Sequence, residues 1–178
     1  MSEKTDVYTK TKDQMRLSER IAAFLPGFRG YKEKEIRRES DRLIRNHLYL
    51  KLTDAKNDLR TISQKLADRR YFDVITDVDR LLAKMDRIVE KVNHASYGYS
   101  GFFDAVKVKE ENLDRMIDFD NQLMDGINVL TAEVDGFKAD LASGVTTNLK
   151  TRVQNVTDKL ENLEDTFDRR NEVILGVT

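Results

Sequence analysis

Apolar residues recur at alternating steps of three and four through four stretches of the chain. This spacing places them along one face of an α-helix, and a seven-residue repeat is typical of helices that pack along one another. The stretches predict long helices over about residues 31–68, 71–93, 110–142 and 145–174. Strand-like alternation is essentially absent. The pattern therefore predicts an all-α fold.

The expected core positions form one stripe on each helix. They include Leu48, Leu52, Ala55, Leu59, Ile62 and Leu66 in the first; Phe72, Ile75, Val78, Leu82, Met85, Val89 and Val92 in the second; Leu123, Ile127, Leu130, Val134, Phe137 and Leu141 in the third; and Val145, Leu149, Val153, Val156, Leu160, Leu163 and Phe167 in the fourth. Short connections near Arg70 and Ser143 make consecutive helices antiparallel neighbours. We expect an elongated antiparallel bundle of about four long helices with coiled-coil-like packing, and Leu59, Leu82, Leu130 and Leu160 buried at its middle.

The remaining segments complete a single domain over residues 13–178, after a polar N-terminus over 1–12 that we expect to be poorly ordered. Residues 14–25 predict a short amphipathic helix that ends at Pro26. Its apolar side carries Leu17, Ile21, Phe24 and Leu25. Residues 95–109 predict an irregular loop rich in aromatic side chains. Because the second long helix is shorter than the first, this loop should lie against the beginning of the first helix. A candidate interaction surface gathers there, made of Phe24, Phe28, Arg29, Tyr31, Tyr97, Tyr99, Phe102 and Phe103.

Composition narrows the function classes. Charged residues make up 35% of the 178 residues, and 31 Lys and Arg balance 32 Asp and Glu, which argues against a dedicated nucleic-acid-binding protein. The residues up to Lys51 are nevertheless net basic, with thirteen basic and eight acidic side chains. The chain has no cysteine, so disulfides, zinc–thiolate sites and thiol nucleophiles are excluded. The longest apolar run, over residues 21–25, is far too short for a membrane span. We expect a cytoplasmic protein that could also lie at the inner face of the membrane.

Few residues suggest chemistry. Glu90 and His94 are spaced i, i+4 and could hold one metal ion weakly, but such a pair is common by chance in a glutamate-rich chain. An ordinary solvated helix end explains it better, and we predict no metal and no cofactor. Asp120 interrupts the third apolar stripe. A buried Asp120 would be a polar register device or half of a carboxylate pair, although we expect it to face solvent or to pair with a lysine. An enzyme would have to use carboxylates such as Asp104, Asp118 and Asp120 with the loop tyrosines.

Two stretches, LPGFRGYKEKEIRRESDRLIRNHL at residues 25–48 and YGYSGFFDAVKV at 97–108, resemble a family of small uncharacterised helical proteins of bacteria and archaea. That resemblance covers most of the chain and implies an intracellular prokaryotic protein without implying a chemistry. In architecture alone, the chain is also similar to phage shock protein A and other membrane-remodelling helical hairpins.

The leading functional hypothesis is a non-enzymatic helical interaction or scaffold protein, with a protein partner or self-association. The alternative is a peripheral membrane protein that uses the amphipathic segment 14–25 and the basic residues within 29–45 on an anionic membrane surface. An unrecognised enzyme with a carboxylate and tyrosine site is the third hypothesis.

Overall fold

The computed structural model describes residues 34–95 and 110–175, with side chains placed for 41–95 and 115–173. Within these ranges the chain forms α2 (Lys34–Asp68), α3 (Phe72–His94), α5 (Glu110–Ser143) and α6 (Leu149–Leu175), and no strand. The prediction of an all-α bundle of four long helices is confirmed. The expected helix over 14–25, the N-terminal residues 1–12 and the aromatic loop from residue 96 onward lie outside the described residues.

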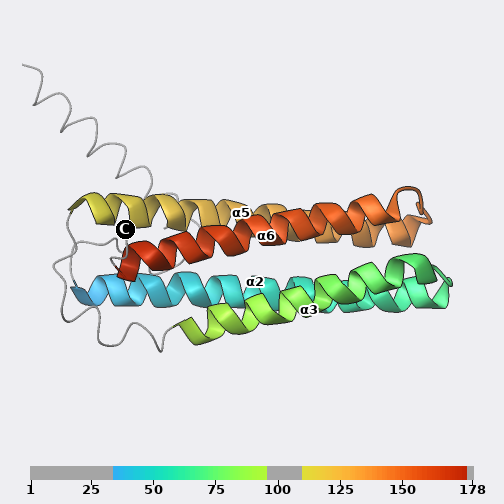
Figure 1. Ribbon diagram of the computed structural model, residues 1–178, viewed down its shortest axis with the longest axis horizontal. Helices are drawn as coiled ribbons and strands as arrows, with labels where there is room; N and C mark the ends of the chain where they lie inside the picture. Colours follow the sequence, from blue (N-terminus) through green and yellow to red (C-terminus); the bar gives the residue numbers. More distant parts are fainter. Residues whose placement is uncertain (1–33, 96–109, 176–178) are drawn as a thin grey trace, which may run out of the picture.

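The bundle consists of two antiparallel hairpins, α2–α3 and α5–α6, whose turns lie at the same end of the molecule (Figure 1). Hence α2 runs parallel to its neighbour α5, and α3 runs parallel to α6. Contacts between α3 and α6 show this directly, because Lys84–Glu161, Arg87–Glu164 and Lys91–Asp168 all join residues 77 positions apart. A constant offset requires two helices to run in the same direction.

Both turns close the preceding helix in the same way. At the end of α2, the N–H of Tyr71 donates to the carbonyl of Leu66 and the N–H of Arg70 donates to that of Ala67. The same pair of bonds ends α5, where Gly144 takes the place of Arg70. This motif needs a left-handed residue, which is Gly144 (φ 80°) in one turn and Arg70 (φ 63°) in the other. Glycine adopts that conformation without steric strain and arginine does not.

The core follows the predicted stripes on α2, α5 and α6, and Leu59, Leu130 and Leu160 are fully buried. The stripe predicted for α3 is partly wrong. Leu82 is only partly buried and Phe72 is 65% exposed, whereas the core face carries Val74, Val78, Leu81, Met85, Ile88, Val89 and Val92. Two overlapping seven-residue repeats exist on this helix, and α3 is rotated towards the one that contains Leu81.

The start of α6 was also predicted too early. The helix begins at Leu149, after Asn148 in the left-handed region (φ 64°), and not at Val145. Val145 lies in the turn and is 44% exposed, so it contributes no core position. Residues 145–148, which the apolar pattern assigns to the helix, belong to the connection between α5 and α6.

Candidate interaction site

A buried ionic cluster lies at the end of the bundle opposite the turns. It joins Asp41 on α2, Asp120 on α5 and Arg170 on α6, whose side chains are at most 3% exposed. Arg170 Nε donates to Asp120 Oδ1 at 2.5 Å, and Arg170 Nη1 donates to Asp41 Oδ1 at 2.8 Å. Arg45 Nε donates to the other oxygen of Asp41 at 2.8 Å. Two guanidinium groups and two carboxylates therefore balance each other inside the bundle.

Burial and ion pairing act in opposite directions on the pKa values of the two partners Asp120 and Arg170. Burial raises the pKa of Asp120 by more than the charge and hydrogen bond of Arg170 lower it. Burial also opposes the charge on Arg170, but the two carboxylates raise the pKa of that guanidinium, which stays charged. Its Nη2 atom is buried and has no hydrogen-bond partner within the described part of the chain. A permanently charged guanidinium cannot transfer a proton, so this cluster fits a structural role better than an acid–base role.

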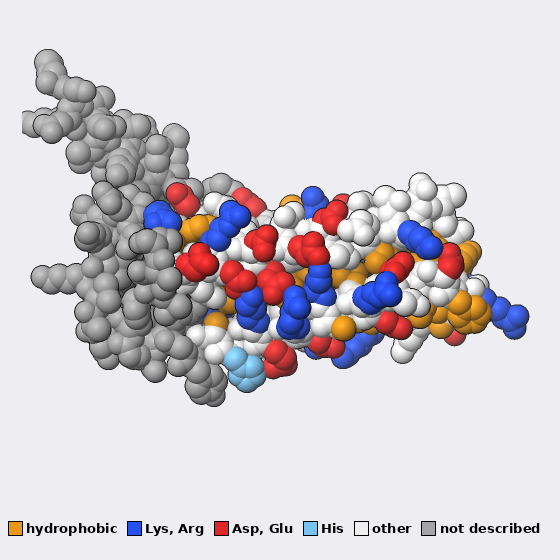
Figure 2. Space-filling view, viewed as in Figure 1, with side chains coloured by type: hydrophobic (Ala, Val, Ile, Leu, Met, Phe, Trp, Pro, Cys, Tyr) orange, Lys and Arg blue, Asp and Glu red, His pale blue; other side chains and the backbone are white. Residues whose placement is uncertain are grey.

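An ionic seam joins α3 to α6 on the outside of the bundle. Lys84 pairs with Glu161, Arg87 with Glu164, and Lys91 with both Glu164 and Asp168. Figure 2 shows the acidic side chains gathered along α6 above the basic side chains of α3. Burial alone would raise the pKa of Glu164, but its hydrogen bond and charge interaction with Lys91, together with Arg87, lower it. The seam remains largely in contact with solvent, so each pair contributes little stability.

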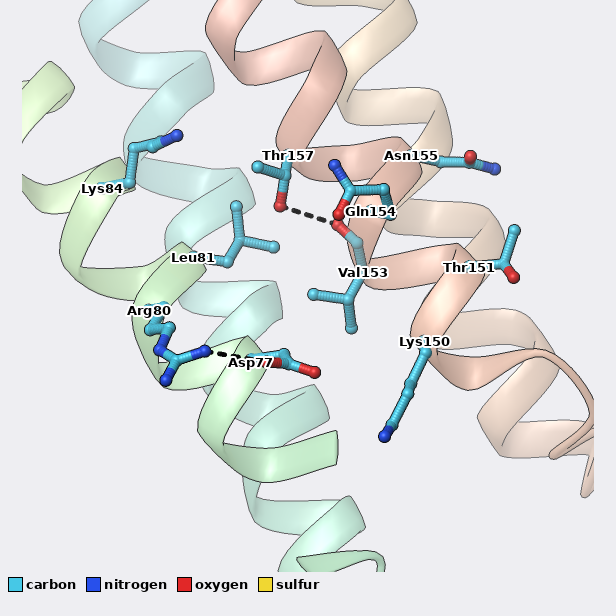
Figure 3. A pocket seen from close by; sticks show the side chains of 10 residues that line it. All are labelled: Asp77, Arg80, Leu81, Lys84, Lys150, Thr151, Val153, Gln154, Asn155 and Thr157. Carbon is cyan, nitrogen blue, oxygen red and sulfur yellow. Dashed lines mark hydrogen bonds and ion pairs between the residues drawn. The ribbon is translucent and has the colours of Figure 1, made fainter. Parts of the chain in front are cut away.

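The same two helices enclose a groove of about 730 Å³ nearer the turns. Leu81 of α3 and Val153 of α6 form its base and point towards each other (Figure 3). Besides Lys150, the α6 side is lined by uncharged polar side chains, namely Thr151, Gln154, Asn155 and Thr157. Apolar atoms are visible between the helices in this part of the surface (Figure 2). Farther from the turns, Arg87 and Lys91 of α3 bridge to Glu164 and Asp168 of α6.

The rim of the groove is electrically balanced. Arg80 pairs with Asp77 at 3.3 Å, Lys84 pairs with Glu161, and Lys150 lies 3.8 Å from Asp73. Asp120 and Glu164 do not line it. A groove with an apolar base and a rim of paired charges and polar side chains is suited to binding a surface rather than to chemistry.

Most of the site residues predicted from sequence are not placed by the structure. All eight residues of the predicted interaction surface, and Asp104, lie outside the described residues. The expectation for Asp120 is wrong, because its carboxylate is fully buried and pairs with an arginine. Asp118 is exposed, so these two carboxylates do not share a cleft. His94 Nε2 lies 3.0 Å from Glu90 Oε2 on an exposed surface, and no group of three metal-binding side chains occurs among the described residues.

Sequence reasoning missed the partner of Asp120, although a signal was present. Arg170 follows Leu163 by seven residues and Phe167 by three. This spacing places Arg170 at a core position of the fourth stripe. Asp41 extends the first stripe in the same way, three residues before Ile44. Opposite charges at core positions of different helices predict a buried ion pair. The residues that line the groove show no comparable pattern in the sequence.

The described helices include none that is both long and apolar enough to cross a bilayer. No protein-family model, no curated protein and no solved structure matches the chain.

Proposed function

We propose that the protein is a non-enzymatic helical interaction or scaffold protein that binds a protein partner, or a second copy of itself, along the α3–α6 groove. The observation that supports this function is the apolar base of that groove, formed by Leu81 and Val153 where the two hairpins meet. Grooves between helices commonly accept an amphipathic helix whose apolar side chains enter at helical spacing.

The chemistry of the groove favours this function over catalysis. The titratable side chains on its rim form ion pairs along the surface and do not converge on a common point. A catalytic centre needs a positioned acid, base or nucleophile within reach of one reacting atom. The exposed Asp118 and the buried Asp120 do not supply such a centre either.

A matched pair of variants tests the proposal. Gln154→Trp places a large ring in the groove, whereas Gln64→Trp makes the same change on the exposed outer face of α2. We expect both proteins to unfold at the wild-type temperature. Gln154→Trp should lose partner capture from a lysate, or self-association by light scattering, and Gln64→Trp should keep it.

The same preparations separate the competing functions. Equal capture by both variants would contradict binding in the groove, and so would the absence of any captured protein or self-association. Co-sedimentation with anionic vesicles, lost in high salt and unaffected by Gln154→Trp, would instead support the peripheral membrane function. A photo-crosslinking residue introduced at position 154, with position 64 as control, would identify the partner by mass spectrometry.

A further inference from the structure

The apolar stripes do not by themselves determine how the two hairpins align along the bundle axis. On α2, leucine recurs every seven residues at Leu52, Leu59 and Leu66. On α5, the equivalent positions are Leu123, Leu130 and Phe137. Sliding one hairpin by seven residues, roughly 10 Å along the axis, would place apolar side chains opposite apolar side chains again. Another feature must exclude these alternatives.

The buried ionic cluster breaks this repeat. One of its bonds, from Arg170 to Asp120, lies within the α5–α6 hairpin and is insensitive to sliding. The other, from Arg170 to Asp41, connects that hairpin to α2. If α2 slid by seven residues along α6, either Leu48 or Lys34 would occupy the position that Asp41 now holds beside Arg170. The first would leave the guanidinium against an apolar side chain, and the second would place it at the level of a like charge.

The exposed ion pairs between the hairpins also favour the observed alignment. Lys138 pairs with Asp58 between α5 and α2, and the seam pairs α3 with α6. These side chains are long and partly solvated, so they can exchange partners at small cost. The buried Arg170 has no such freedom, because sliding would leave it with Asp120 but remove Asp41, one of the two carboxylates that compensate its desolvated charge.

We propose that the Asp41–Arg170 link is the device that fixes the register of the α2–α3 hairpin on the α5–α6 hairpin. Buried polar pairs that set the alignment of packed helices do so at the expense of stability, since an apolar replacement packs without desolvating charges. The cluster thus selects one alignment from a set that the apolar core alone would accept.

The absence of native cysteine allows the register to be read by thiol crosslinking. Lys138→Cys is combined in turn with Asp58→Cys, Lys51→Cys and Lys65→Cys. The first pair reports the native alignment, and the other two report shifts of seven residues in either direction. With a bifunctional thiol reagent shorter than the ~10 Å rise of seven residues, the wild-type sequence should couple almost entirely through positions 58 and 138.

Two matched variants then separate register from stability. Asp41→Leu removes the buried bond between the hairpins, together with the Arg45–Asp41 pair, and leaves Arg170 with Asp120, whereas Asp120→Leu leaves Arg170 with Asp41. We expect Asp41→Leu to raise coupling through positions 51 or 65 several-fold and Asp120→Leu to retain the wild-type pattern. Unchanged coupling in a folded Asp41→Leu protein would overturn the proposal, as would equal loss of register in both variants.

If circular dichroism shows that Asp41→Leu is unfolded, Asp41→Asn is assayed by the same criterion against Asp120→Asn. A combined variant with Asp41→Leu, Arg45→Met, Asp120→Leu and Arg170→Met, which replaces all four charges of the cluster, provides an independent measurement. It should unfold at a higher temperature than the wild type while coupling in more than one register. A combined variant that is folded and couples only through positions 58 and 138 would also overturn the proposal.

Discussion

Replacing Arg170 with methionine tests the energetics of the buried cluster. The change keeps an unbranched apolar side chain of about the length of the arginine stem, but it removes the guanidinium and both hydrogen bonds to the carboxylates. Asp41 retains Arg45, so the main loss is at Asp120, which stays buried without the guanidinium. Breaking a buried ion pair from one side costs about 3–5 kcal/mol. That is a large part of the roughly 5–15 kcal/mol that stabilises a typical domain.

The loss should depend on pH in a defined direction. Arg170 lowers the pKa of Asp120, so its removal raises that pKa further above the unfolded value. The folded variant then binds a proton at Asp120 that the unfolded chain does not bind, and its stability rises as the pH falls through the raised pKa. The difference between wild type and Arg170→Met should therefore be greatest near neutral pH and smaller in mild acid. Adding Asp120→Asn, which imitates the protonated carboxyl group, should recover part of the loss at neutral pH.

Urea unfolding followed by circular dichroism at several pH values measures these differences. For a chain of this size, a loss of 3–5 kcal/mol corresponds to a fall in Tm of about 6–20 °C. A loss below about 1 kcal/mol would refute the assignment of Asp120 and Arg170 as a desolvated pair, because exposed pairs contribute that little. A loss that does not vary with pH would show that packing, and not the carboxylate, causes it.

Three further substitutions test the helices and turns by thermal unfolding. Arg70→Gly should stabilise the bundle by about 0.5–1 kcal/mol by relieving the left-handed backbone at the α2–α3 turn, and destabilisation would contradict the strain at this position. Gly136→Ala should stabilise α5 by up to about 1 kcal/mol. Gly126→Ala should stabilise it less, because the added Cβ would lie 3.1 Å from Leu163 Cδ1 of α6. Equal stabilisation by both substitutions would mean that α5 and α6 do not pack closely. Leu160→Ala should cost about 2–5 kcal/mol, and a cost near zero would be incompatible with its full burial.

The sequence was sufficient to predict the architecture because helical periodicity extends over most of the chain. Leu59, Leu130 and Leu160 show this, since each lies at the centre of a long stripe and is buried as predicted. Periodicity was less informative on α3, where two overlapping repeats were available. The choice between Leu81 and Leu82 as core residues depends on how α3 is rotated against α2 and α6, which the sequence of one helix does not contain.

The candidate site was less predictable than the fold for a related physical reason. Asp120 could be recognised as an exception to its stripe, but its environment depends on Arg170 and on Asp41, 129 residues away from that arginine. The groove depends on how α3 and α6 lie against each other, because Leu81 of one helix faces Val153 of the other at its base. Neither helix has an unusual sequence pattern by itself, and the groove forms only where the two hairpins pack together.

The parallel arrangement of the two hairpins has a consequence for the order of folding. Contacts within a hairpin are local, as between Ser63 and Asp79 or between Asp140 and Arg152, which are 16 and 12 positions apart. Arg69 must reach across 72 positions to the carbonyl of Leu141, and Arg170 across 129 to Asp41. Because closing a long loop costs more conformational entropy, each hairpin should form rapidly and their docking should limit the folding rate. During synthesis, α2 and α3 can therefore pair before α6 exists, and their apolar faces remain exposed until the second hairpin docks.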